Sequence, residues 1–159
     1  QNHPNVMFHI CGGCDDHKYL ETVKKAENAG YMQYHGEQKD MLPYYQMAHC
    51  VVHPSYYPEG MSNVLLEAAA SGRPVIATDR SGCRETVDEG KTGYLIPIRD
   101  EDALVQALED FLNLTWKERA ELGRAGRLKM EHEFDRQIVV QKYLDTLRDY
   151  QASLCEVRR

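Results

Sequence analysis

The chain has 159 residues, of which 42% are hydrophobic and 28% are charged, and its formal net charge at pH 7 is −6. This length predicts one domain with a sizeable core. The acidic balance, with no basic run beyond residues 157–159, argues against a nucleic-acid-binding surface. No apolar run approaches the ~18–20 residues needed to cross a membrane. The five cysteines form no even disulfide framework, which predicts reduced thiols in a cytosolic setting.

The chain opens on Gln1 without a signal-peptide pattern and reaches its first apolar segment at once, which is typical of an excised fragment. Short apolar runs then alternate with segments whose apolar residues recur at helical spacing. We expect strands at 6–11, 31–35, 50–54, 74–78 and 94–97, a helical turn at 83–88, and helices at 15–29, 39–49, 62–71, 100–112, 115–133 and 135–154. Because the strands are continuously apolar, we expect an α/β fold with a parallel sheet, covered by helices on both faces.

Two carboxylates frame the stretch PSYYPEGMSNVLLE, which runs from Pro54 to Glu67. Ser62 and Asn63 are both good N-cap residues, so a helix is expected to open there and to offer free backbone N–H groups to an anion. Glu59 precedes this helix, and Glu67 lies roughly 6–8 Å further along its axis at 1.5 Å per residue. The spacing suits a nucleotide-sugar, with phosphate at the N–H groups and hydroxyls at the carboxylates. A loop glutamate and an ordinary helix-surface glutamate are the simpler alternative.

Ligands of parallel α/β sheets bind beyond the carboxyl ends of the strands. Three polar or glycine-rich segments follow predicted strands: Gly12-Gly13, residues 36–38 and residues 55–63. Their shared position favours a ligand site that includes Glu59 and Glu67.

Other signals point to different chemistry. Cys11-Gly12-Gly13-Cys14 follows a strand and precedes a helix, where a thioredoxin-type pair would lie, but a structural turn is the favoured interpretation. No second Cys-x-x-C or suitably spaced histidine pair supports zinc. Gly12-Gly13 is not a G-x-G-x-x-G fingerprint, so a nicotinamide site is not favoured.

Residues 53–97 closely resemble the retaining GT-B glycosyltransferases of family 4, also called the group 1 glycosyl transferases. The hallmark of that family is a pair of glutamates with seven residues between them. The segments His9–Gly13 and His35–Asp40 match its upstream glycine motifs. The residues that carry the hallmark here are Pro54, Ser55, Glu59, Gly60, Leu65, Leu66, Glu67, Ala68, Ala70, Gly72, Pro74 and Val75.

The resemblance implies a role for each matching residue. Glu59, the catalytic candidate, would hold hydroxyls of the donor sugar, and Glu67 would accept the ribose hydroxyls. The base would lie near the turn that contains His35 and Gly36. The backbone at the helix start would meet the sugar and the diphosphate. The full set of implied donor-binding residues is Gly12, Gly13, His35, Gly36, Gly60, Met61, Ser62, Asn63, Val64 and Glu67.

A loop that faces the cleft in the family contains Arg80 and Arg84, on either side of Ser81-Gly82-Cys83. Contact with a phosphate or an acceptor and simple surface salt bridging are both open for these two arginines. Glu85 and Gly93 belong to a following family stretch, and the simpler role for both is to hold local structure.

The resemblance implies the donor-binding half of an enzyme that transfers a hexose with retention. The donor would be a nucleoside diphosphate sugar, with UDP-sugar expected, and the acceptor a growing polysaccharide or lipid-linked glycan. No metal or other cofactor is expected, and the expected location is cytoplasmic, with membrane contact only through the parent protein. A sugar-nucleotide epimerase of the same fold and a non-catalytic nucleotide-binding module are the alternatives.

Relative to the family, the chain begins at what resembles the second strand of the donor-binding domain. The chain would therefore lack the first strand of that domain, which should be central in the sheet, and the helix that follows it. It would also lack the whole N-terminal domain. We expect residues 1–134 to form the nucleotide-sugar-binding domain. Residues 135–159 would form a helix that packs on the missing domain, with an apolar patch at Leu144, Leu147 and Tyr150. The chain alone is expected not to catalyse transfer.

Overall fold

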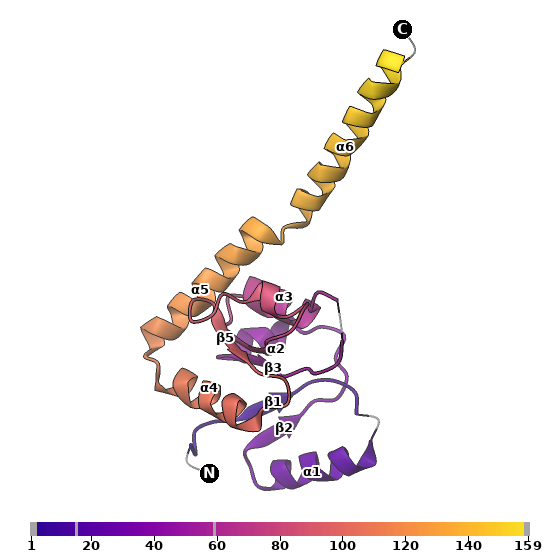
Figure 1. The fold of residues 1–159 in the computed structure, drawn as a ribbon. Coiled ribbons are helices and arrows are strands. Elements are labelled where there is room, and N and C mark those ends of the chain that lie inside the picture. Colours follow the sequence, from indigo (N-terminus) through magenta and orange to yellow (C-terminus); the bar gives the residue numbers. More distant parts are fainter. Residues whose placement is uncertain (1–2, 15, 59, 158–159) are drawn as a thin grey trace. The chain divides into compact units, whose positions relative to one another are not determined.

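The computed structural model describes residues 3–14, 16–58 and 60–157. They belong to two compact units, Gln1–Pro43 and Tyr44–Arg159. In the first unit, strand β1 (Phe8–Ile10) is followed by helix α1 (His17–Asn28) and strand β2 (Met32–Tyr34) (Figure 1). The two strands pair in parallel, with Phe8 opposite Met32. The side chain of Asp16 accepts a hydrogen bond from the Lys18 amide and so caps α1.

The expectation of a buried strand at 6–11 is wrong. Phe8 is 40% exposed, and His9 is exposed as well. The first unit has one full helix and a ladder of two three-residue strands, and these are too few elements to cover both faces of a sheet. An apolar run therefore forms a strand here without being fully buried.

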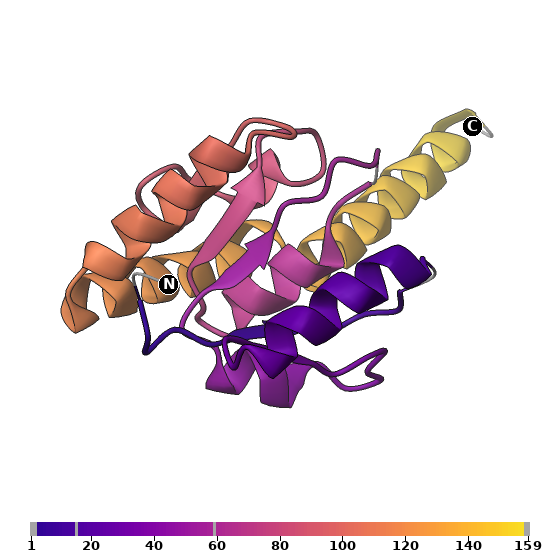
Figure 2. The same ribbon diagram turned by 90° about the horizontal axis from the view of Figure 1, so that it is seen from below.

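The second unit contains a parallel sheet of three strands in the order β3-β4-β5, formed by Val51–His53, Val75–Thr78 and Gly93–Ile96. Every residue of β4, the central strand, is buried. Helix α4 (Glu101–Asn113) covers one face, where its residues Ala107 and Phe111 form a core cluster with Ile76 and Ile96 (Figure 2).

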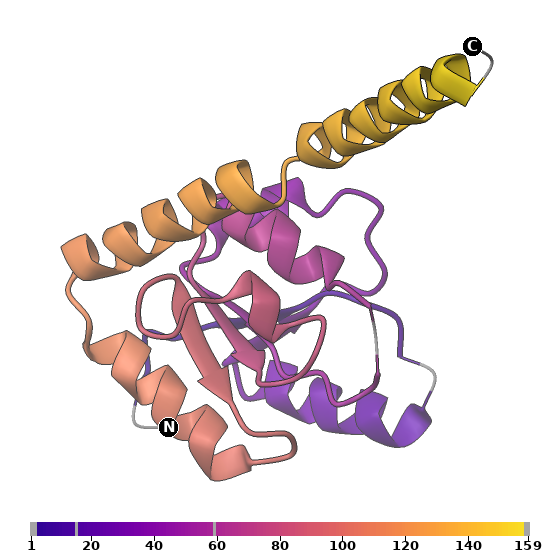
Figure 3. The same ribbon diagram turned by 45° about the horizontal axis from the view of Figure 1, so that its top comes forward.

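Helices α3 (Asn63–Ala70) and α5 (Trp116–Glu133) cover the other face of this sheet (Figure 3). Helix α5 comes close to the turn that follows α3. A Cβ on Gly123 of α5 would lie 2.1 Å from the carbonyl oxygen of Gly72 in that turn. A Cβ on Gly93 of β5 would likewise lie 2.0 Å from the carbonyl oxygen of Val75. Both positions therefore exclude any larger residue, and the predicted structural role of Gly93 is confirmed.

The remaining elements follow local sequence signals. Helix α2 (Leu42–Met47) has Pro43 in its first turn and is shorter than the expected 39–49. A single 3₁₀ turn, η1, spans Arg84–Thr86. Asp100 caps α4, and Thr115 and Glu118 form a capping box at the start of α5.

Helix α6 (Arg136–Val157) is exposed along all of residues 136–152. Leu144, Leu147 and Tyr150 are 43%, 57% and 61% exposed, so the predicted apolar patch is present. Among the described residues, no helix is both long enough and apolar enough to span a membrane.

The α/β class and the parallel pairing of the strands are confirmed. The five described strands form two ladders, β1-β2 and β3-β4-β5, instead of one sheet. Each of β1 and β3 pairs with a single described strand, so each keeps one unpaired edge.

Candidate functional site

The start of α3 is the first part of the candidate site. Ser62 is the N-cap in extended conformation, and the helix begins at Asn63, as the sequence predicted. Its hydroxyl makes no capping hydrogen bond, although Ser62 is only 1% exposed. Within the described residues its Oγ has no hydrogen-bond partner. The first N–H groups of a helix have no partner inside the helix, so this end of α3 keeps its capacity to bind an anion.

The backbone of Ser62 is fixed by a neighbouring loop. Its amide donates to the carbonyl oxygen of Gly82 at 2.9 Å. The Gly82 amide in turn donates to Oε2 of Glu85 at 2.7 Å, and the Ser81 hydroxyl donates to Oε1 at 3.4 Å. Hydrogen bonding to its own backbone amide, then to Gly82 and Ser81, lowers the pKa of Glu85. Glu85 therefore holds the loop that positions the start of α3, which confirms its predicted structural role.

Glu67 lies further along α3 and is exposed. Its Oε2 accepts a hydrogen bond of 3.1 Å from the hydroxyl of Tyr45. Tyr45 is 4% exposed, so a buried phenol orients this carboxylate. Sequence analysis did not identify this contact, because no local pattern links residues 22 positions apart.

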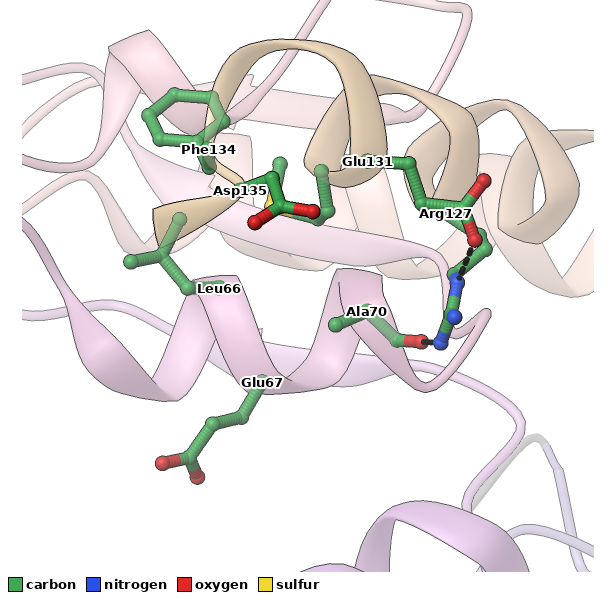
Figure 4. Close-up of a pocket in the computed structure, with 8 residues that line it drawn as sticks. Leu66, Glu67, Ala70, Arg127, Glu131, Phe134 and Asp135 are labelled. Carbon is green, nitrogen blue, oxygen red and sulfur yellow. Dashed lines mark hydrogen bonds and ion pairs between the residues drawn. The ribbon is translucent and has the colours of Figure 1, made fainter. Parts of the chain in front are cut away.

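A groove of about 310 Å³ lies between α3 and α5 (Figure 4). Arg127 at its rim donates to the carbonyl oxygen of Ala70 and pairs with Glu131. The groove is lined by Leu66, Glu67, Ala70, Arg127, Met130, Glu131, Phe134 and Asp135. Glu67 thus contributes to the edge of the groove, while its carboxylate points away from the side chains of Leu66 and Phe134.

The glycine turns of the first unit contact each other at the carboxyl ends of β1 and β2. Gly12 and Gly36 both have positive φ, 137° and 65°, which favours glycine at each position. The Gly12 amide donates to the Gly36 carbonyl oxygen at 2.8 Å, and the Tyr34 hydroxyl donates to the Gly12 carbonyl oxygen at 2.8 Å. Nδ1 of His9 lies 2.9 Å from Nε2 of His35. The unit therefore joins Gly12-Gly13 with His35-Gly36, two pairs that the sequence predicted to serve one ligand.

The other predicted site residues lie before and at the start of α3. Glu59 lies outside the described residues. Gly60 and Asn63 are exposed, and Met61 and Val64 are 45% and 37% exposed, so the approach to the helix start is open to solvent.

The cysteines whose side chains the structure describes, Cys11 and Cys14 among them, are free thiols. Burial raises the pKa of Cys50 to about 12, which makes it an inert thiol. No cluster of three or more histidine, cysteine or acidic side chains that could hold a metal occurs in the part of the chain that the structure describes.

Comparison with known proteins adds independent information. The family described as "Glycosyl transferases group 1" matches residues 1–129. The putative colanic acid biosynthesis glycosyltransferase WcaL of Escherichia coli is 41% identical over 81 residues, 51% of this chain and 20% of WcaL. Spore coat protein SA of Bacillus subtilis is 30% identical over 154 residues, 91% of this chain and 41% of that protein.

Solved structures share the fold. Sucrose-phosphate synthase from Thermosynechococcus elongatus superposes with a TM-score of 0.79 at 28% identity, over 94% of this chain and 40% of that one. HepE from Anabaena, in complex with UDP, superposes with a TM-score of 0.82 at 22% identity, over 92% of this chain and 42% of that one. The chain spans less than half the length of each of these relatives.

Proposed function

The chain belongs to the glycosyl transferases group 1 family, and on that premise we propose that it binds the nucleotide-sugar donor of a retaining glycosyltransferase. The observation that carries the proposal is the start of α3. Ser62 is buried there without a partner for its hydroxyl among the described residues, and Glu67 on the same helix is oriented by Tyr45. The open helix end suits the diphosphate, and the oriented carboxylate suits a diol.

The donor is proposed to be a UDP-sugar. HepE, which shares the fold, has been solved with UDP and with UDP-glucose. In this assignment Glu67 accepts hydrogen bonds from the ribose hydroxyls, and Glu59 holds hydroxyls of the sugar. The backbone from Gly60 to Val64 binds sugar and diphosphate, while Gly12-Gly13 and His35-Gly36 line the site near the base.

The whole protein is proposed to transfer a hexose onto a growing glycan. Relatives named for colanic acid and capsular polysaccharide biosynthesis support this acceptor class. Because the chain spans about 40% of its structural relatives, we propose that residues outside it complete the catalytic centre. No metal or organic cofactor is part of the proposal.

Calorimetric titration of the 159-residue chain with UDP, GDP and ADP tests the donor assignment. We expect UDP to bind most tightly. Glu67→Gln should weaken UDP binding about tenfold or more, because hydrogen bonds to a carboxylate contribute roughly 1.5–3 kcal/mol. Glu131→Gln is the control, since Glu131 borders the groove from α5. Loss of UDP binding in Glu131→Gln but not in Glu67→Gln would place the nucleotide in the groove and contradict the assignment.

Incubation of the chain with UDP-glucose tests whether residues outside the chain are needed for catalysis. The chain should bind the donor but release no UDP above the uncatalysed rate, because groups outside it are proposed to complete the catalytic centre. Measurable turnover by the 159-residue chain would overturn that part of the proposal.

A further inference from the structure

Arg80 lies in the loop that follows β4. Its Nε and Nη1 atoms are buried, and neither has a hydrogen-bond partner among the described residues. A guanidinium is always charged in proteins, and a buried charge without a partner is destabilising. Arg80, a residue of intermediate exposure just beyond the carboxyl end of the central strand, therefore holds two buried guanidinium nitrogens without a partner among the described residues.

Arg80 differs from two other arginines in its hydrogen bonding. Arg73 and Arg119 also have a buried Nε without a partner. Arg73 nevertheless donates through Nη2 to the Gln46 carbonyl oxygen at 3.0 Å, and Arg119 donates through Nη2 to the Leu112 carbonyl oxygen at 2.7 Å. In the described part of the chain, no acceptor is found for any nitrogen of the Arg80 side chain.

The acidic side chains of the same loop are engaged elsewhere. Asp79 pairs with Nε of Arg84 at 2.9 Å. Glu85 accepts from the Gly82 amide and the Ser81 hydroxyl. Within the described residues, neither carboxylate pairs with Arg80, so its buried nitrogens can bind an anion from outside the loop.

The loop also joins Arg80 to the start of α3. The Gly82 carbonyl oxygen, two residues from Arg80, accepts the Ser62 amide at 2.9 Å. The buried atoms Nε and Nη1 of Arg80 and Oγ of Ser62, which have no partner among the described residues, therefore lie in segments that hydrogen-bond to each other. Arg80 is a cation and Ser62 is at a helix N-terminus, and both favour an anion with several oxygen acceptors.

We propose that Arg80 is a diphosphate-binding residue and that its guanidinium, together with Ser62 and the first amides of α3, binds the phosphates of the donor. The proposal rests on the proposed function, because it assigns the nucleoside diphosphate as the anion. It adds to this chain a basic group for the leaving diphosphate, where charge develops during transfer.

The role of Arg80 is tested by measuring the affinities of three ligands: UDP, inorganic pyrophosphate and uridine. The proteins compared are the wild-type chain, Arg80→Gln, Arg80→Lys and Arg84→Gln. Arg80→Gln should weaken UDP and pyrophosphate binding about ten- to a hundredfold, as expected for loss of a charge-assisted contact. Arg80→Lys should recover part of the loss. Uridine, which has no phosphate, should bind the wild-type chain and Arg80→Gln with equal affinity.

Arg84→Gln is the matched control, because it removes the same charge from the same loop at an exposed, already paired arginine. It should change the affinities less than about twofold, as for most surface ion pairs. Thermal unfolding without ligand separates binding from structure. Arg80→Gln should leave Tm unchanged or raise it, since it removes a charged group with two buried nitrogens that lack a partner among the described residues. A lower Tm, with UDP and uridine affinities falling together, would show a structural role and overturn the inference.

The outcomes also separate this inference from the proposed function. UDP binding that depends on Glu67 but not on Arg80 would overturn the role of Arg80 alone. Pyrophosphate binding that depends on Arg80, without preference for any nucleotide, would support the role of Arg80 and overturn the nucleotide-sugar assignment. A wild-type chain that binds neither UDP nor pyrophosphate would overturn both.

Discussion

Helices α3 and α5 pack against each other, yet their N-termini are built in opposite ways. At α5, the Thr115 hydroxyl accepts the Glu118 amide, and the Glu118 carboxylate accepts the Thr115 amide. At α3, the Ser62 hydroxyl caps nothing and has no partner among the described residues. Both N-cap residues are hydroxyl side chains of a type that favours this position.

The difference distinguishes a helix capped by its own side chains from the helix that is proposed to bind the donor. The α5 end is satisfied by its own side chains, so it contributes to stability without a ligand. The N-terminus of α3 is held by the Gly82 loop, and α5 packs closely at Gly123 against Gly72, just beyond the other end of α3. The capping groups at the N-terminus of α3 stay available for an anion.

The largest expected effect comes from breaking the packing that holds α3. Gly123→Ala would place a Cβ 2.1 Å from the Gly72 carbonyl oxygen, so α3 and α5 must separate. We expect a loss of about 1–3 kcal/mol of unfolding free energy and weaker UDP binding. Urea denaturation and calorimetry measure these two quantities.

Gly126→Ala is the control on the same helix. Its new Cβ would make only ordinary contacts, the nearest 3.6 Å from the Ala69 Cβ. Because alanine favours helix over glycine by about 1 kcal/mol, this variant should be stabilised. Equal destabilisation of both variants would contradict the close approach at Gly123.

The caps themselves provide the next test. Thr115→Ala should cost about 1 kcal/mol of unfolding free energy, as is typical for loss of an N-cap. Ser62→Ala should cost little or nothing in the unliganded chain, because it removes a buried hydroxyl without a partner. Urea denaturation of both variants measures the contrast. A cost for Ser62→Ala as large as that for Thr115→Ala would show that Ser62 caps α3 after all.

Tyr45→Phe sharpens the assignment of Glu67 with a smaller effect. It removes the 3.1 Å hydrogen bond to the Glu67 carboxylate while keeping the buried ring. UDP affinity should fall by about three- to tenfold, in line with a hydrogen bond of roughly 1 kcal/mol. Pyrophosphate affinity, which depends on the helix start, should stay constant. A parallel loss of both affinities would argue against a role for Glu67 at the ribose.

The smallest expected effect concerns the loop that supports the start of α3. The folded-state pKa of Glu85 is lowered, so its carboxylate stabilises the fold above its ordinary pKa of about 4.5. That stability is lost as pH falls through the lowered value. The difference in Tm between the wild-type chain and Glu85→Gln should therefore be constant above this range and shrink at lower pH. A difference that does not change with pH would contradict the assigned role.

Local signals in the sequence predicted much of the fold. Helices expected to begin at 62, 100 and 115 begin at Asn63, Glu101 and Trp116, and their caps depend on residues a few positions apart. Such patterns are readable from one sequence because the interacting groups are neighbours in the chain.

Other features depend on contacts between distant segments. The exposure of β1 and the division into two ladders follow from which elements are present to cover and pair with each strand. The Tyr45–Glu67 hydrogen bond joins different helices. The isolation of Arg80 became visible only once its neighbours were known to be engaged elsewhere. Sequence analysis placed Arg80 near a ligand or at the surface but could not choose between the two.

The central position of β4 has a consequence for how the molecule opens. Among the described strands, β4 alone has a partner on each side, and all four of its residues are buried. Its amide hydrogens should therefore exchange with solvent most slowly, while those of β1 exchange through frequent local opening. The Arg80 loop begins directly at the end of this strand, so the groups proposed to bind phosphate are anchored to the part of the chain that is expected to open last.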